Sequence, residues 1–176
     1  MNCNYNQLTS LNVSANTALT TLYCGSNQLT SLDVSVDTAL TQLICVSNQL
    51  TSLNISTNTA LTYLGCFENK LTSLDVSANT AITYLDCSYN FLASLDVSTH
   101  TALTALYCSY NSLTSLNIQN GNNANLFLDA THNPALTCIQ VDNVANANSY
   151  TGVTFFKDAT ASYSANCGAL SVPDIG

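Results

Sequence analysis

Residues 71–91 read LTSLDVSANTAITYLDCSYNF, and most of the chain consists of copies of this stretch. A shift of 21 positions forward gives LASLDVSTHTALTALYCSYNS, and successive shifts backward give LTSLNISTNTALTYLGCFENK, LTSLDVSVDTALTQLICVSNQ and LTSLNVSANTALTTLYCGSNQ. One cysteine per copy keeps the same spacing; these are Cys3, Cys24, Cys45, Cys66, Cys87 and Cys108. Self-similarity at a fixed period of about 20–50 residues is typical of solenoids, in which each repeat packs on its neighbours. The repeat therefore predicts a solenoid.

Each repeat contains two short apolar segments with the periodicity of a β-strand. In the first full repeat they occupy residues 8–13 and 19–24, and each ends in two apolar residues separated by one outward position. Alternation with a period of two is strand spacing, and turn formers interrupt both segments before a stable helix could form. We expect a mainly β solenoid of 21-residue coils, with two short parallel strands per coil on opposite sides and little helix.

Asparagine recurs where the chain must turn between these segments. It tolerates left-handed backbone geometry, and its amide bonds backbone groups that stacked corners would otherwise leave unpaired. One corner column consists of Asn6, Asn27, Asn48, Asn69, Asn90 and Asn111, and the other of Asn16, Asp37, Asn58, Asn79 and His100. We interpret His100 as a turn residue rather than a catalyst.

The balance of charge excludes several classes of partner. Ten acidic residues stand against two basic ones, giving a formal net charge of −8. Binding to nucleic acid or to an anionic membrane surface requires several lysine or arginine residues, and this chain has only Lys70 and Lys157. No apolar run approaches the roughly 18 residues that a membrane-spanning helix needs. We expect neither nucleic-acid binding nor membrane insertion.

The second apolar segment carries a resemblance to a known family. Residues 19–29, LTTLYCGSNQL, fit the pattern LxxLxCxxNxL and resemble the core of a leucine-rich repeat, with cysteine at the third apolar position. The TSLDVSVDTA that follows resembles a nested second copy, and one repeat departs by placing Ile82 where the others have leucine. This nested 21-residue type is similar to bacterial leucine-rich repeats of Bacteroidetes surface or secreted proteins. The resemblance implies a concave, ligand-binding surface on the second segment.

The repeat rhythm breaks after Ile118, which divides the chain into two parts. We assign the leucine-rich repeats to residues 1–120, with the first repeat partial, and the last irregular coil and C-terminal cap to residues 121–176. Such a cap covers the open core and strand edge of a solenoid. Residues 133–143, NPALTCIQVDN, resemble the closing segment of the same bacterial proteins. Cys138 and Cys167 lie outside the 21-residue column, and we interpret them as a disulfide that pins the cap.

The cysteine column has three possible interpretations. Zinc requires converging ligands, often from CxxC pairs, and the column supplies one cysteine per coil on a straight line. A ladder of disulfides is conceivable, because neighbouring strands lie about 4.8 Å apart, within the range of disulfide Cα separations. We favour buried free thiols that act as small apolar side chains, and we expect no metal and no cofactor.

The two strand faces differ in variability. The first segment presents a uniform row of serine with Asn or Asp, which we interpret as a solvated face; Asp75 and Asp96 supply too few oxygens for a cation site. The second segment is variable and holds almost every aromatic residue of the repeats. Exposed aromatic residues favour recognition surfaces, although stacking of Tyr63 on Tyr84 and of Tyr89 on Tyr110 would also stabilise the sheet. The predicted ligand-binding residues are Tyr23, Tyr63, Phe67, Glu68, Tyr84, Asp86, Tyr89, Phe91, Tyr107 and Tyr110.

No catalytic constellation accompanies His100 or His132, and we expect no enzyme. The leading hypothesis is a non-catalytic module that recognises a protein or glycan. One alternative is a structural spacer or filament segment, and another is an ice-binding protein. Met1 directly precedes the back half of a repeat, so we expect a piece of a larger multidomain chain. The predicted disulfide, the charge-poor surface and the family resemblance favour an extracellular or cell-surface location.

Overall fold

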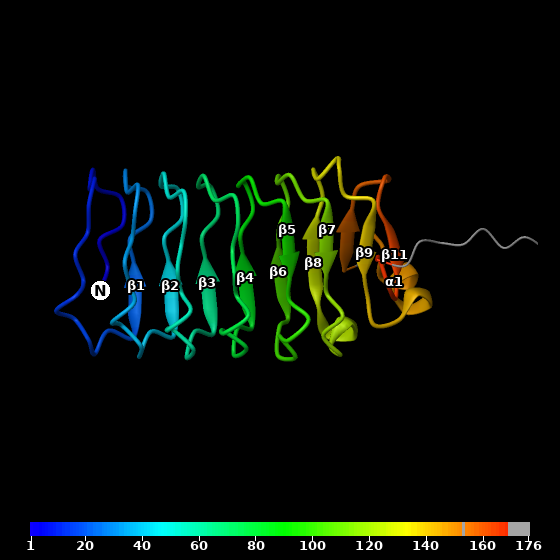
Figure 1. Cartoon of the computed structure of the whole chain (residues 1–176), viewed down its shortest axis with the longest axis horizontal. Coiled ribbons are helices and arrows are strands. Elements are labelled where there is room, and N and C mark those ends of the chain that lie inside the picture. The colour runs from blue at the N-terminus through cyan, green and yellow to red at the C-terminus, as the bar shows by residue number, and fades with distance from the viewer. Residues whose placement is uncertain (153, 169–176) are drawn as a thin grey trace, which may run out of the picture.

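The computed structural model describes residues 1–152 and 154–168, and it is a solenoid whose coils stack in a single row (Figure 1). One side of the row is a parallel sheet of seven strands in the order β1-β2-β3-β4-β6-β8-β10. The strands are β1 (Thr21–Tyr23), β2 (Gln42–Ile44), β3 (Tyr63–Gly65), β4 (Tyr84–Asp86), β6 (Ala105–Tyr107), β8 (Phe127–Ala130) and β10 (Phe155–Lys157). The predicted mainly β solenoid is confirmed.

In β1, β2, β3, β4 and β6 the middle residue of the strand points into the core, whereas in β10 the first residue, Phe155, does so. Leu64 pairs in register with Leu85, and Leu85 pairs with Leu106. These leucines are fully buried, as are Cys66 and Cys87 two positions further along. Each buried leucine stabilises the fold by about 2 kcal/mol relative to an exposed one. The same contact repeats in every coil, so the core is a continuous column.

A second, four-stranded sheet on the opposite side has the order β11-β9-β7-β5 and occupies only the C-terminal coils. Its strands are β5 (Ser94–Asp96), β7 (Ser115–Asn117), β9 (Cys138–Gln140) and β11 (Ser162–Ser164). The corresponding residues 31–33, 52–54 and 73–75 form no strand and make no backbone hydrogen bonds to the next coil. Leu53 and Leu74 retain 7% exposure there, against 2% for Leu116, and a hollow between two coils is lined by Ser52 and Ser73. The earlier coils therefore stand too far apart on this side for their N–H and C=O groups to meet, and the predicted second strand is wrong for these coils.

The first asparagine column holds the corners as predicted. Asn69 donates from Nδ2 to the carbonyls of Cys66 (3.1 Å) and Cys45 (3.0 Å), and its Oδ1 accepts from the N–H of Leu50 (3.0 Å). The same pattern recurs at Asn27, Asn48, Asn90 and Asn111. Each asparagine thus joins two coils and satisfies backbone groups that the turn buries.

The second corner column is also buried from its second member onward. Asn58 and Asn79 each donate to two carbonyls of the preceding coil, and His100 is fully buried with a pKa lowered by that burial. A buried, neutral imidazole agrees with the interpretation of His100 as a turn residue.

The cysteine column consists of free thiols. Burial raises the pKa of Cys24 to about 12, and it also raises the pKa values of Cys45 and Cys66. Cys3, in the first coil, is the partly exposed member. Since a thiolate is the reactive form, the buried members are chemically inert side chains of the core.

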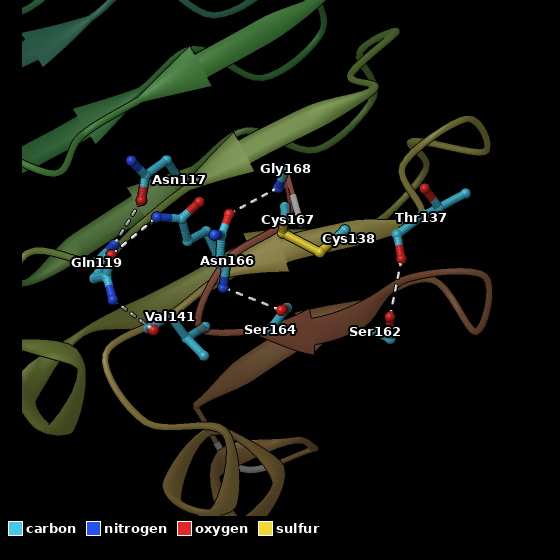
Figure 2. The surroundings of a disulfide bond; sticks show 11 residues. Asn117, Gln119, Thr137, Cys138, Val141, Ser162, Ser164, Asn166, Cys167 and Gly168 are labelled. Carbon is cyan, nitrogen blue, oxygen red and sulfur yellow. Dashed lines mark hydrogen bonds between the residues drawn. A yellow bond between two sulfur atoms is a disulfide. The ribbon is translucent and has the colours of Figure 1, made fainter. Parts of the chain in front are cut away.

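The last coil contains the predicted disulfide. Cys138 in β9 is bonded to Cys167, just beyond β11, with a Cα–Cα distance of 5.8 Å (Figure 2). The 3-10 helix η1 (Asn123–Asn125) and the helix α1 (Val144–Tyr150) complete the irregular end. Neither they nor any other helix in the described ranges has the length and apolarity to cross a bilayer. The division of the chain at residue 120 stays a prediction, since the main sheet runs on from β6 to β8.

Candidate functional site

Five aromatic rings form one continuous band on the outward face of the main sheet, which we call the aromatic strip. Its members are Tyr63, Tyr84, Tyr107, Phe127 and Phe156. The rings of Tyr63 and Tyr84 stack at 4.3 Å with an interplanar angle of 3°. The next contacts are tilted, with centroid distances of 5.6 Å from Tyr84 to Tyr107, 5.3 Å from Tyr107 to Phe127 and 5.6 Å from Phe127 to Phe156. The predicted stacking of Tyr63 on Tyr84 is confirmed.

A small residue explains why the strip is unbroken. Ala105 lies between Tyr84 and Phe127 in the strand register. Its methyl group leaves room beside it, and the ring of Tyr107, two positions along the same strand, contacts both neighbouring rings. Tilted and stacked pairs at these distances are favourable aromatic contacts, so each ring helps to hold its neighbour in place.

Two carboxylates flank Tyr107 in the strip. In the register Asp86 is the partner of Tyr107 on one side and Asp129 is its partner on the other. Asp86 Oδ1 accepts from the N–H (3.1 Å) and hydroxyl (2.8 Å) of Ser88, and Asp129 Oδ1 accepts from the N–H (3.1 Å) and hydroxyl (2.7 Å) of Thr131. Burial raises the pKa of Asp86, the bonds from Ser88 oppose that rise, and the charge of Asp129 adds to it.

A second group of stacked rings, which we call the corner stack, lies one corner away and consists of Tyr89, Tyr110 and His132. The Tyr89 and Tyr110 rings are 4.2 Å apart at 9°, and the Tyr110 and His132 rings are 3.9 Å apart at 10°. All three residues have positive φ, between 52° and 57°. Left-handed backbone is unfavourable for bulky residues and suits Gly or Asn better, so backbone preference does not explain these aromatic side chains. Phe91, two positions after Tyr89 in the chain, is also exposed, at 58%.

The structure does not bring all the predicted binding residues together. Tyr23 is separated from Asp86 by Ile44 and Gly65 in the register, and its hydroxyl donates to Gln42 Oε1 at 2.6 Å. Glu68 occupies the corner column one coil before Tyr89 and accepts from the Ser47 hydroxyl at 2.6 Å. Phe67, next to it in the chain, is half-buried. These residues lie on the same side as the strip but outside its contacts.

Sequence reasoning missed Phe127, Asp129, Phe156 and His132. The first two face outward from β8, and His132 completes the corner stack. The available signal was a step of 22 rather than 21, which relates Ala105 to Phe127 and Tyr110 to His132. One inserted residue had hidden the continuation of the columns beyond the repeat break.

On the uniform serine and aspartate face, the aspartate side chains accept hydrogen bonds from the serine two positions further along the chain. Asp75 Oδ1 accepts from the N–H of Ser77 at 2.9 Å, and hydrogen bonds from Ser77 lower the pKa of Asp75. Asp96 Oδ1 accepts from the N–H of Ser98 at 2.8 Å. Within residues 1–152 and 154–168, no three His, Cys, Asp or Glu side chains gather as metal ligands would. These aspartates therefore hold turns.

The fold is that of a leucine-rich-repeat solenoid, and solved bacterial proteins share it. The functional domain of InlJ from Listeria monocytogenes, described as including a cysteine ladder, is 38% identical over 80% of this chain and 35% of that one, with a TM-score of 0.69. The Leptospira interrogans leucine-rich-repeat protein LIC12759 is 21% identical over 93% of this chain and 42% of that protein, with a TM-score of 0.64. The Listeria monocytogenes internalin InlF is 20% identical over 92% of this chain and 46% of that protein, with a TM-score of 0.59.

This chain thus spans less than half the length of each of these three solved proteins. No protein-family model matches the sequence, and no curated protein matches it. The likeness to bacterial leucine-rich-repeat proteins agrees with the family resemblance seen in the sequence.

Proposed function

We propose that this chain is a non-catalytic binding module that recognises a protein or glycan through the aromatic strip and the corner stack. The carrying observation is the strip itself, five contacting rings on the outward face of a rigid sheet. Rigid aromatic side chains supply large contact areas, and little conformational freedom remains for them to lose on binding. Proteins of this fold are typically interaction modules, which supports the same proposal.

Individual residues take different roles in this proposal. Tyr84 and Tyr107 anchor the ligand, because they occupy the middle of the strip. Asp86 sets the polarity at the centre, and Glu68 does so at the rim. The proposed rim also includes Tyr89 and Tyr110 of the corner stack, together with Phe91, Phe67 and Tyr23.

The proposed setting is a cell-surface or secreted protein of which this chain is one part. The Cys138–Cys167 disulfide supports it, because disulfides persist in oxidising compartments. The likeness to Listeria internalins agrees with that setting.

An array experiment tests the proposal. The unsubstituted chain, called the parent protein below, is applied to an array of glycans and of surface proteins. A variant in which Tyr63, Tyr84, Tyr89 and Tyr107 are all changed to serine is applied beside it. We expect the variant to lose capture of whatever ligand the parent binds, while both fold to the same circular-dichroism spectrum. Tyr5→Ser is the matched control. Tyr5 has the same left-handed backbone as Tyr89 and is 85% exposed, but it lies in the first coil, outside the strip.

The spacer hypothesis makes the opposite prediction. Its support is the regularity of the coils, whose strands pair in one unbroken register along the main sheet. If the parent protein captures nothing on a broad array, or if the fourfold tyrosine variant still binds, the binding proposal is wrong. The ice-binding hypothesis has less support, because the Thr62 and Thr83 hydroxyls donate to carbonyls of the preceding coil.

A further inference from the structure

We propose that Asp86 and Asp129, on either side of Tyr107, form a slot for one cationic side chain, a lysine or arginine carried by a basic segment of a partner protein. This inference rests on the proposed binding function and names the chemistry of the ligand at the centre of the strip.

The register sets the width of the slot. Adjacent strands lie about 4.8 Å apart, so two carboxylates separated by one intervening strand lie about 10 Å apart. A guanidinium or ammonium group placed midway between the two carboxylates, at the strand of Tyr107, is then about 5 Å from each of them. Tyr84 and Phe127 close the two sides of the Tyr107 ring. The slot therefore has a carboxylate at each end and aromatic rings along one side.

The two carboxylates are held in place and keep one oxygen free for a ligand. In each, Oδ1 accepts two bonds from the residue two positions further on, Ser88 or Thr131. Within the described ranges, Oδ2 of neither Asp86 nor Asp129 takes part in a protein hydrogen bond. Because the turn bonds fix the direction of each carboxylate, a ligand does not have to order them, which favours binding.

Nothing in the strip neutralises these charges. The chain has two basic residues, and both are occupied: Lys70 Nζ donates to Gln49 Oε1 at 3.1 Å, and Lys157 Nζ donates to the carbonyl of Ala161. Asp86 is half-buried, and its raised pKa has the charge of Asp129 among its causes. A cation between them would offset both the desolvation and the repulsion.

This arrangement favours a basic protein segment over a glycan. A neutral sugar can donate hydroxyl hydrogen bonds to the carboxylates but does not offset the repulsion between their charges, and an anionic glycan is repelled by both carboxylates and by the net charge of −8. A cation gains from both carboxylates, and the neighbouring aromatic rings add cation–π attraction, which acts within about 6 Å. Charge complementarity therefore points to lysine or arginine.

The test compares an arginine peptide with its neutral counterpart. A fluorescent peptide with four arginines spaced by Gly-Ser is titrated with the whole chain, and a second peptide carries citrulline in place of each arginine. We expect the citrulline peptide to bind at least tenfold more weakly, and Asp86→Asn with Asp129→Asn to weaken arginine-peptide binding at least tenfold. Equal affinity for the two peptides, or no binding of the arginine peptide, would overturn the slot.

The matched control is Asp75→Asn with Asp96→Asn, which removes the same charge from the opposite face. Asparagine occupies the equivalent positions 54 and 117, so these changes are compatible with the fold. If this control variant lowers the affinity for the arginine peptide as much as Asp86→Asn with Asp129→Asn does, the attraction is only a net-charge effect and the slot is refuted. If the array ligand is lost in the tyrosine variant but bound equally by the slot variant, the slot is wrong and the binding function stands.

Discussion

Asn58 donates hydrogen bonds from Nδ2 to the main-chain carbonyls of Asp37 and Val34, both at 2.9 Å, yet the carboxyl group of Asp37 in the same corner column has no hydrogen-bond partner among the described residues. Asp37 is fully buried. By the 21-residue equivalence, its carboxyl group faces the carbonyls of Val13 and Asn16, to which an asparagine would donate. An ionised carboxylate has no proton to donate, so this corner lacks the bonds that the next coils have.

Asp37→Asn should therefore stabilise the protein. The added donors are expected to raise the free energy of unfolding at pH 7 by about 1–2 kcal/mol. Burial, with the charge of Asp33, raises the pKa of Asp37 in the folded state. The contribution of Asp37 to the free energy of unfolding is thus fully present below its unfolded pKa of about 3.8. That contribution is lost as pH rises through the folded pKa. Urea denaturation of both proteins between pH 4 and pH 7 measures the effect.

The gain from Asp37→Asn should grow across that pH window. Asp75→Asn is the control, because Asp75 is exposed, hydrogen bonds from Ser77 lower its pKa, and its charge is not among the causes that raise the pKa of Asp37. A neutral or destabilising Asp37→Asn substitution at pH 7 would show that the buried carboxyl has partners that the carbonyl arrangement does not predict.

Asn69→Ala should destabilise the central coils by about 3 kcal/mol. The substitution leaves the N–H of Leu50 and the carbonyls of Cys45 and Cys66 without the asparagine partner, in a corner that water does not reach. Asn54→Ala is the comparison, since Asn54 is exposed and its side chain accepts hydrogen bonds from the neighbouring Ser56. The urea midpoint should fall for the first variant and stay nearly constant for the second. Equal midpoints would contradict the structural role of the column.

Thiol titration distinguishes the cysteine interpretations. In the native protein only Cys3 should react quickly with a disulfide reagent, because Cys24 and the members after it are buried. After unfolding without reductant, six thiols should react, and after reduction all eight. An unfolded, unreduced protein without reactive thiols would instead support a disulfide ladder.

Reduction of the Cys138–Cys167 disulfide should loosen the C-terminal end. The bond closes a loop with a sequence separation of 29, which corresponds to about 3–4 kcal/mol in the chain-entropy model. Cys138→Ala with Cys167→Ala should lower the thermal midpoint and increase hydrogen exchange of β9 and β11 before that of β3. Exchange that rises equally in β3 would mean that the bond stabilises the whole solenoid, not the cap.

Much of the site could be predicted because the period is so regular. The alternation around Leu85 assigns Tyr84 and Asp86 to the outward face, and the 21-residue step places Tyr63 beside Tyr84. The contact of Tyr107 with Tyr84 could not be predicted in this way. It depends on the space left by Ala105 and joins side chains from two different columns.

The coil, its inward leucines and cysteines and its asparagine corners all follow from the repeat, because each residue meets an equivalent in the next coil. The repeat does not determine the spacing of coils on the second side, where β5 and β7 pair but the earlier segments do not. Nor does it place Asp129 beside Tyr107, because the inserted residue after Ile118 shifts the columns by one. Only packing of β8 against β6 restores the register, since a strand displaced by one residue would turn Leu128 out of the core.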